Sequence, residues 1–226
     1  MSVAHYTANS LAEFVDLVCK IKAPLRKDGL RFNEIPLFRG HADNSYQLIP
    51  AIARPIESFS SDSLIHEERN LIEMAKFKLP DVFREDMQPL ELLALLQHYG
   101  VPTRLLDVTE NALVALYFAC CSKNNDHDPD GEVIIFKNNE LEVANYPIIN
   151  AIADSYRFAT SSQTFHDFYR NLMCQPYFAE QKHSKGTRFD SLDDAAKWLY
   201  KVFSEPHFVY APIRSQRQRA QQGRYL

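Results

Sequence analysis

The polar residues best suited to chemistry gather in one short run of the chain, residues 96–109. The run combines a possible proton carrier, two hydroxyls, a guanidinium and a carboxylate: His98, Thr103, Thr109, Arg104 and Asp107. A histidine exchanges protons near neutral pH, and an arginine fork binds carboxylates and phosphates. Gly100 and Pro102 favour a sharp joint between two elements. The pattern therefore predicts a polar joint that presents side chains and helix N–H groups to an anion.

The same run has a structural interpretation, and the sequence leaves both open. Asp107 or Thr109 is placed to cap the following helix, and Arg104 is placed to pair with Asp107. His98 stands at the end of a helix, where it would satisfy carbonyl groups.

A second polar cluster lies within and after the apolar run that begins at residue 35. Arg39 lies inside this run, and a charged group there is costly unless it is paired or holds an anion. Gly40 lets a ligand or another backbone come close. The alternative is an Arg39 that faces solvent from a half-buried strand. Further polar and aromatic residues follow downstream: His41, Tyr46 and Arg54.

A third cluster is the basic, glutamine-rich segment 214–225. One interpretation is a strand that brings Gln222 back to the site, or a contact with phosphates. The other is a solvated basic tail.

Periodicity and turn signals predict an α+β chain, because helices and strands mix without regular β-α-β alternation. We expect small mixed sheets with flanking helices in a single domain, residues 1–226, with an N-terminal helix over about 10–22 and a core over about 35–226. Ser10 and Glu13 predict a capping box, and Phe14, Leu17, Val18 and Ile21 then form an apolar stripe on one face of the first helix. Pro89 suits the first position of a later helix, and Gly100 suits the residue after its end. The expected helices are 10–22, 62–79, 89–99, about 110–122, 162–173 and 191–203, and the expected strands are 35–40, 46–49, 104–107, 132–137 and 207–213.

Composition argues against several classes of protein. The net charge of −4 gives no overall basic field for nucleic acid. The 4 cysteines form no CxxC pair, and no apolar run is long enough for a membrane span, so we expect a cytoplasmic protein with reduced thiols. The aspartates of loop 124–131 lack the glutamate that completes a calcium loop, so no metal is expected.

The chain resembles the FRG domain family, which is named for a Phe-Arg-Gly signature. The resemblance rests on LFRGH at 37–41, on LLALLQHYGVPTRLLDVTENALVALYFA at 92–119 and on RAQQGRY at 219–225. The middle segment is highly specific, and the resemblance extends over most of the chain. Members usually continue beyond the QQG segment.

Some FRG features resemble the ADP-ribosyltransferases, which implies a related core and NAD as a substrate. That group places an arginine or histidine on its first core strand, a hydroxyl on a second element and a glutamate on a later strand. Arg39 matches the first position, and Thr109 or Tyr117 matches the second. Gln221 and Gln222 stand where the glutamate is usual, so Asp107 becomes the candidate for the acidic role.

The expected function is therefore ADP-ribosyl transfer from NAD to a macromolecule, either RNA, DNA or protein, by a toxin or antiviral effector that has an antitoxin partner and does not bind membranes. The expected catalytic residues are Arg39, His98, Asp107 and Gln222. The expected NAD contacts are Arg39, His41, Tyr46, Arg54, Thr103, Arg104, Thr109 and Tyr117. One alternative is a binding module without catalysis for a nucleotide, a nucleic acid or a partner protein. A phosphate-ester hydrolase is disfavoured, because no compact acidic metal cluster is present.

Overall fold

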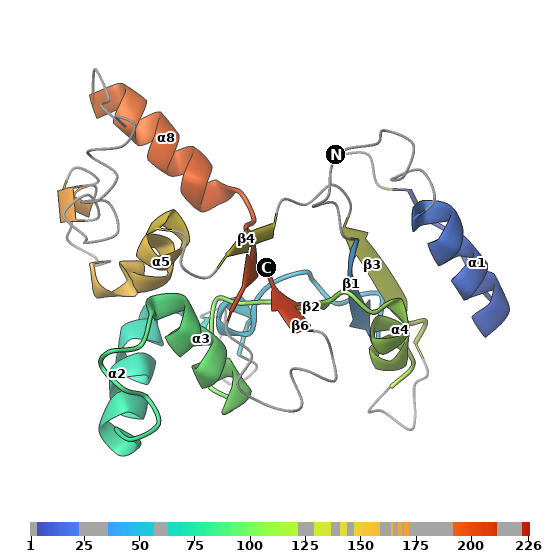
Figure 1. The fold of residues 1–226 in the computed structure, drawn as a ribbon, viewed down its shortest axis with the longest axis horizontal. Helices are drawn as coiled ribbons and strands as arrows, with labels where there is room; N and C mark the ends of the chain where they lie inside the picture. The colour runs from blue at the N-terminus through green and yellow to red at the C-terminus, as the bar shows by residue number, and fades with distance from the viewer. Residues whose placement is uncertain are drawn as a thin grey trace. The chain divides into compact units, whose positions relative to one another are not determined.

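A computed structural model describes residues 4–22, 36–56, 63–121, 129–136, 141–143, 147–158, 164, 167–168, 170–171, 192–211 and 223–226. Figure 1 shows the elements along the chain, and the α+β class is confirmed. The helices are α1 (Leu11–Lys22), η2 (Ala51–Ala53), η3 (Leu64–Glu67), α2 (Glu68–Lys78), α3 (Pro89–His98), α4 (Ala112–Cys120), α5 (Pro147–Asp154), η4 (Ser155–Arg157) and α8 (Leu192–Ser204). The strands are β1 (Leu37–His41), β2 (Asp107–Thr109), β3 (Glu132–Phe136), β4 (Leu141–Val143), β5 (Phe208–Tyr210) and β6 (Gly223–Tyr225).

The chain divides into two compact units. Unit 1 contains Met1–Ser45 and Thr109–Glu140, and unit 2 contains Tyr46–Val108 and Leu141–Leu226. A single domain over residues 1–226 stays a prediction. Among the helices that the structure describes, none has the length and apolar character needed to cross a membrane.

The sheet of unit 1 is built around β1. This strand pairs antiparallel with β3, which places Arg39 opposite Ile134 and His41 opposite Glu132. On its other side Phe38 pairs with Thr109. The predicted partner strand at 46–49 is wrong, because the N–H of Ile49 donates to the Gln47 carbonyl in a tight turn instead.

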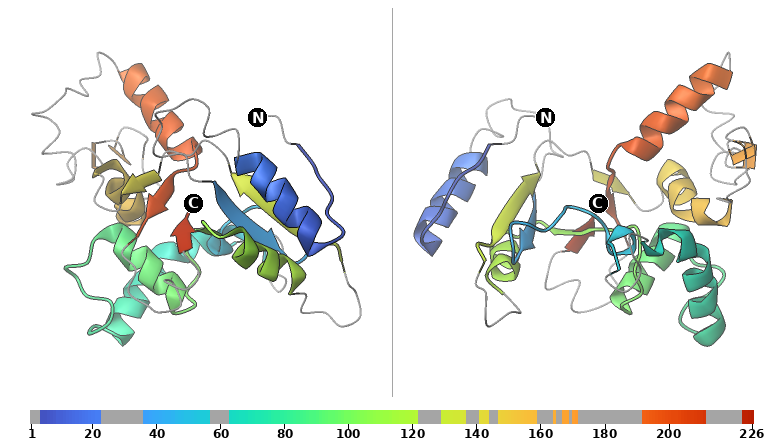
Figure 2. Two further views of the ribbon diagram at one scale, coloured as in Figure 1. Left: turned by 45° about the vertical axis from the view of Figure 1, so that its right-hand side comes forward. Right: turned by 180° about the vertical axis from the view of Figure 1, so that it is seen from behind.

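The core of unit 1 joins helices α1 and α4 to one face of β1. Phe38 is fully buried and shares a cluster with Phe14 and Val18 of α1. Ala112 and Ala115 of α4 complete the cluster. Both views in Figure 2 show α1 and α4 lying beside β1 and β3. The predicted apolar stripe of the first helix is therefore its packing face.

Unit 2 packs the helices α2, α3 and α5 around a larger core. Its buried side chains are mostly aliphatic and come from all three helices: Ile72, Leu90, Leu92, Leu93, Leu96, Ile149 and Ala153. Strand β5 of this unit pairs parallel with β4 and antiparallel with β6. Leu106 and Leu226 exchange two backbone hydrogen bonds, so the segment before β2 runs beside the end of the chain. The strand predicted at 104–107 instead begins at Asp107.

Both ends of α3 are closed by specific contacts. Pro89 occupies the first turn as predicted, and the Leu90 N–H donates to Oδ1 of the buried Asn150 at 3.3 Å. At the other end Gly100 has a φ of 84°, a conformation that side chains disfavour. The Gly100 N–H donates to the Gln97 carbonyl and the Val101 N–H to the Leu96 carbonyl. These bonds form a Schellman motif, which confirms the prediction for Gly100.

The predicted caps of the helix after β2 are wrong. Asn111 is the N-cap of α4, and its Oδ1 accepts from the Leu113 N–H at 3.0 Å. Thr109 contacts the cap residue itself, because its Oγ1 accepts from the Asn111 N–H at 3.0 Å. Asp107 lies in β2, too far along the chain from the first turn to cap it.

Replacing Asn111 by alanine tests this cap. We expect Asn111→Ala to lower the free energy of unfolding by about 1 kcal/mol, because one helix N–H loses its acceptor. Urea denaturation would measure the change. Asn111→Asp keeps an oxygen at the same place and should stay within about 0.5 kcal/mol of the wild type. Equal losses in both variants would contradict the capping role.

Candidate functional site

A chain of polar contacts crosses the strand pair β1–β3 in unit 1. The Arg39 Nε–H donates to His41 Nε2 at 3.0 Å. On the other side of the ring, His41 Nδ1 lies 2.9 Å from Glu132 Oε1. The His41 side chain is only 4% exposed, whereas Glu132 is 37% exposed. The arginine of the signature is therefore tied through a buried ring to a carboxylate on the neighbouring strand.

The other two signature residues have packing roles on the opposite face of β1. Phe38 fills the core of unit 1. Gly40 lies where the backbone of α4 passes, and a Cβ at this position would come within 1.9 Å of the Ala115 carbonyl oxygen. Ala115 and Ala119 are the small residues that let the helix approach this closely. Phe-Arg-Gly thus combines a core aromatic, an oriented cation and a close helix contact.

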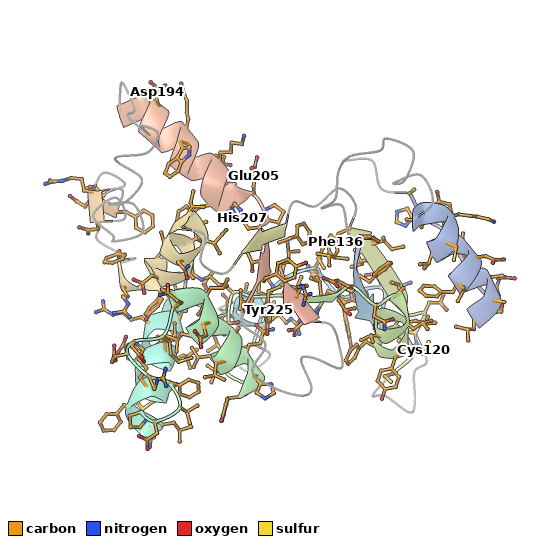
Figure 3. All side chains as sticks on the ribbon, in the orientation of Figure 1. Cys120, Phe136, Asp194, Glu205, His207 and Tyr225 are labelled. Carbon is orange, nitrogen blue, oxygen red and sulfur yellow. The ribbon has the colours of Figure 1, made fainter. Side chains whose placement is uncertain are left out.

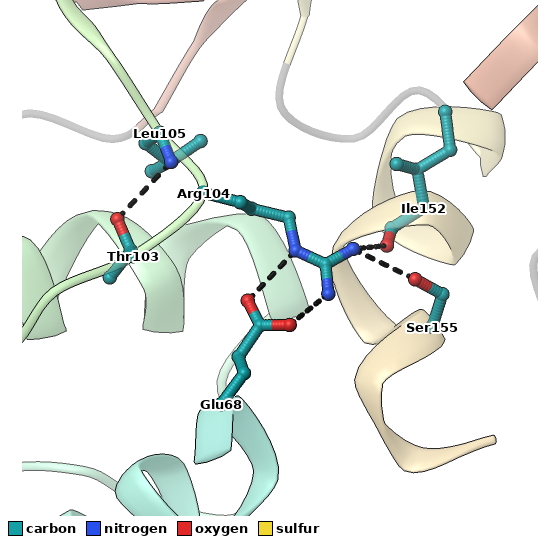
Figure 4. A network of polar contacts seen from close by, with 6 residues as sticks. All are labelled: Glu68, Thr103, Arg104, Leu105, Ile152 and Ser155. Carbon is teal, nitrogen blue, oxygen red and sulfur yellow. Dashed lines mark hydrogen bonds and ion pairs between the residues drawn. The ribbon is translucent and has the colours of Figure 1, made fainter. Parts of the chain in front are cut away.

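Arg104 is the centre of a second network, in unit 2, which Figure 4 shows. Its guanidinium forms a two-pronged pair with the buried carboxylate of Glu68, in which Nε donates to Oε1 at 2.8 Å and Nη2 donates to Oε2. Its Nη1 donates to the Ile152 carbonyl at 3.2 Å and to Ser155 Oγ at 2.9 Å. All three nitrogens of the guanidinium donate within the protein, and the carboxylate that accepts from it is Glu68.

Thr103 is also engaged inside unit 2. It is 2% exposed, and its Oγ1 donates to Gln97 Oε1 at 2.6 Å. The same oxygen accepts from the Leu105 N–H at 3.2 Å, and the Thr103 carbonyl accepts from the Ile52 N–H. These contacts hold the joint after α3 in one shape.

The remaining candidates of unit 2 that the structure describes are exposed. His98 and Asp107 both reach the surface, on either side of the joint that Thr103 and Arg104 hold. The His98 ring contacts the edge of Tyr99. Tyr46 is exposed as well, and Arg54 Nε donates to the Ile49 carbonyl at 3.4 Å.

Thr109 and Tyr117 belong to unit 1. Thr109 is buried and accepts from the start of α4, as described above. Tyr117 is exposed on α4, where a hydrogen bond with Cys121 raises the pKa of its phenol. Tyr117 is therefore protonated at neutral pH and presents an aromatic face with a hydroxyl donor.

A cavity of about 300 Å³ lies within unit 2. Its wall is mainly aliphatic, with Leu93, Leu105 and Ile149 among the residues that form it. Among the predicted site residues that the structure describes, Arg104 lines it. Glu205 and His207, which Figure 3 labels between α8 and β5, add polar groups to the wall.

Over the described ranges, no group of three His, Cys, Asp or Glu side chains is placed to hold a metal ion. Gln222, Gln221 and the arginines at 214, 217 and 219 lie outside the described residues, as do Asp126 and Asp128. The helix predicted at 162–173 falls largely outside them too.

The buried strand with its signature arginine and the joint after α3 lie in the part of the chain that a family model matches. Residues 34–128 match the model of the FRG domain. Over this stretch, which is less than half of the 226 residues, the chain is similar to the FRG domain family. No curated protein and no solved structure matches the chain. The FRG match ends before the segment 219–225, and the likeness to ADP-ribosyltransferases stays a prediction.

Two carboxylates, one inside the matched stretch and one just after it, were missed as site residues by the sequence reasoning. Glu68 holds Arg104, and Glu132 holds His41. Glu68 stands 36 residues from its partner and Glu132 stands 91 residues from its partner. The pairing of the two strands, 35–40 with 132–137, was the one signal that could have brought Glu132 to His41.

Proposed function

We propose that this chain is an ADP-ribosyltransferase that uses NAD and modifies a macromolecule. The observation that supports the proposal most is the setting of Arg39. Its guanidinium is anchored through Nε on a buried strand, which suits an arginine that holds a phosphate group in a fixed direction.

The reaction would break the bond between the nicotinamide nitrogen and C1′ of the ribose. Nicotinamide leaves with the bonding electron pair, a nucleophile of the macromolecule bonds to C1′, and the proton of that nucleophile passes to a base. The exposed positions of His98 and Asp107 suit the base and the carboxylate that stabilises positive charge on the ribose. Gln222 would orient a ribose hydroxyl, and Tyr46 or Tyr117 would stack on a ring.

In this proposal Arg104 and Thr103 are positioning residues. Their polar atoms are engaged by Glu68, Ser155 and Gln97, so they shape the joint that carries His98 and Asp107. The other NAD contacts expected from the sequence are His41, Arg54 and Thr109, of which His41 acts through Arg39.

Arg39→Lys tests the proposal. Lysine keeps the charge but loses the fork geometry and the Nε contact with His41, so nicotinamide release from NAD should fall at least about tenfold. The assay measures released nicotinamide with cell extract as the source of macromolecular acceptors. Arg84→Lys is the matched control, because Arg84 is 56% exposed and forms its ion pair with Asp86, which is 73% exposed. Equal release by Arg39→Lys and the wild type would remove Arg39 from the mechanism.

A binding module without catalysis is the second candidate. The glutamines at 221 and 222 favour it, because an amide supplies no negative charge to a developing cation. It requires ADP-ribose binding that weakens with salt, together with no nicotinamide release from any mixture. Such a result would replace the transferase proposal. We further propose that the transferase acts as a toxin or antiviral effector with an antitoxin partner, which would be sought by co-purification.

A further inference from the structure

We propose that Glu132 is a positioning residue, which holds His41 in one tautomer so that the His41 ring fixes the direction of the Arg39 guanidinium. No sequence pattern assigns Glu132 to the site, and it lies on β3 rather than on the signature strand. The proposal deepens the proposed function and rests on it only for the identity of the anion that Arg39 holds.

The two hydrogen bonds of the His41 ring are compatible with one protonation state. Nε2 must carry a lone pair, because it accepts from the Arg39 Nε–H at 3.0 Å. Nδ1 must carry the proton, because the carboxylate of Glu132 at 2.9 Å can only accept. His41 is therefore neutral, with its proton on Nδ1. A doubly protonated ring would place an N–H of His41 against the N–H of Arg39.

The backbone keeps this chain of contacts short. Arg39 and His41 are two residues apart on β1, so their side chains leave the strand on the same face. His41 lies directly opposite Glu132 in the register of the β1–β3 pair. Cross-strand partners of this kind place their side chains within contact distance. The contact with Glu132 therefore follows from strand pairing and needs no movement of a loop.

Because the His41 ring is buried, its Nδ1–H depends on the Glu132 carboxylate as an acceptor. The ring of His41 is 4% exposed, so water has little access to its nitrogens. Removal of the Glu132 carboxylate would leave the Nδ1 proton of a buried ring without this acceptor, and a proton on Nε2 would then become competitive. With the proton on Nε2 the ring cannot accept from Arg39, and the guanidinium loses its hydrogen bond to His41.

The test measures the ring directly. Long-range ¹H–¹⁵N spectra of the full chain at pH 7.5 would report the His41 tautomer, with His41→Gln used to assign its signals. We expect the Nδ1–H form in the wild type and in Glu132→Gln, whose amide oxygen still accepts. In Glu132→Ala we expect a shift toward the Nε2–H form and loss of the protected Arg39 Nε–H signal. Glu85→Ala, at a carboxylate that is 77% exposed, is the control and should leave both signals unchanged.

Three outcomes would overturn the proposal. They are a wild-type ring protonated on both nitrogens, a wild-type ring in the Nε2–H form, and an unchanged tautomer with an unchanged Arg39 signal in Glu132→Ala. Melting temperatures measured beside the spectra would separate a local change from unfolding of unit 1.

A binding measurement connects the His41 tautomer to the proposed function. With ADP-ribose as the probe, Glu132→Ala should raise the dissociation constant about tenfold, the lower end of the effect of outer partners at metal sites. Glu132→Gln should restore most of the affinity. If the wild type binds no ADP-ribose, the proposed function fails, whereas the tautomer and the Arg39 signal still decide the role of Glu132. If ADP-ribose binds equally to the wild type and Glu132→Ala, the positioning role is overturned.

Discussion

Gly40→Ala is expected to lower the free energy of unfolding by about 3 kcal/mol or more. The added carbon would lie 1.9 Å from the Ala115 carbonyl oxygen and 2.8 Å from the Ala119 nitrogen. Both are backbone atoms of α4, so no side-chain rotation relieves the clash. The helix must move away from β1, which would open the cluster around Phe38.

Thermal unfolding and hydrogen exchange would check this expectation. A loss of about 3 kcal/mol corresponds to a fall of about 6–12 °C in melting temperature for a chain of this size. Exchange should accelerate first at the amides of α4 and β1, because the helix contact is where the clash arises. Normal protection of α4 in a fully stable Gly40→Ala protein would refute the packing explanation of the signature glycine.

Gly100→Ala is the matched control. No atom lies within 4 Å of a Cβ added to Gly100, although its φ of +84° disfavours a side chain. We expect a loss of about 1 kcal/mol, which reflects backbone conformation alone. Comparable losses at the two glycines would mean that the close approach of α4 does not limit position 40.

The sequence predicted well those features that depend on neighbours in the chain. The Schellman motif at Gly100 and the stripe of α1 are set by residues within two turns of each other. A strand was also predicted at 35–40, where β1 spans Leu37–His41, although its partners were not predicted. A short run at 46–49 resembled a second strand, but the true partners, β2 and β3, lie much farther along the chain. Local alternation of apolar residues holds no information about that choice.

The candidate site was harder to predict for the same reason. The family signatures point to Arg39 and Arg104, but the meaning of each arginine depends on a carboxylate that local patterns do not reveal. The guanidinium of Arg104 is paired with the carboxylate of Glu68. The guanidinium of Arg39 donates through Nε to the His41 ring, which lies between Arg39 and Glu132. Two arginines that looked equivalent in the sequence therefore divide into a structural one and an oriented one.

The joint QHYGVPTRLLD at 97–107 likewise contains both supporting residues and exposed ones. Gln97, Gly100, Thr103 and Arg104 make contacts that hold its shape. His98 and Asp107 reach the surface. A highly specific motif is expected to contain more supporting residues than reacting ones, since a reactive group needs several neighbours to fix its position.

Glu68→Ala is expected to cost about 3 kcal/mol, because it leaves the guanidinium of Arg104 without its carboxylate in a largely buried network. The Arg104 side chain is 28% exposed, which places the cost at the lower end of the range for buried pairs. Melting temperature should fall by about 6–12 °C. Asp86→Ala removes a pair whose side chains are 56% and 73% exposed and should change stability by less than about 1 kcal/mol.

The double variant Glu68→Met, Arg104→Met separates structure from ligand binding. Replacing both charges by apolar side chains removes the unpaired group, so part of the lost stability should return. If Arg104 only positions the joint, the stabilised double variant should bind ADP-ribose with nearly the affinity of the wild type. A loss of binding without a loss of stability would instead show that Arg104 holds the anion. If Arg104 is structural, Arg104→Lys should also lower the free energy of unfolding. An ammonium cannot reproduce the paired donors to Glu68 together with the contacts to Ile152 and Ser155.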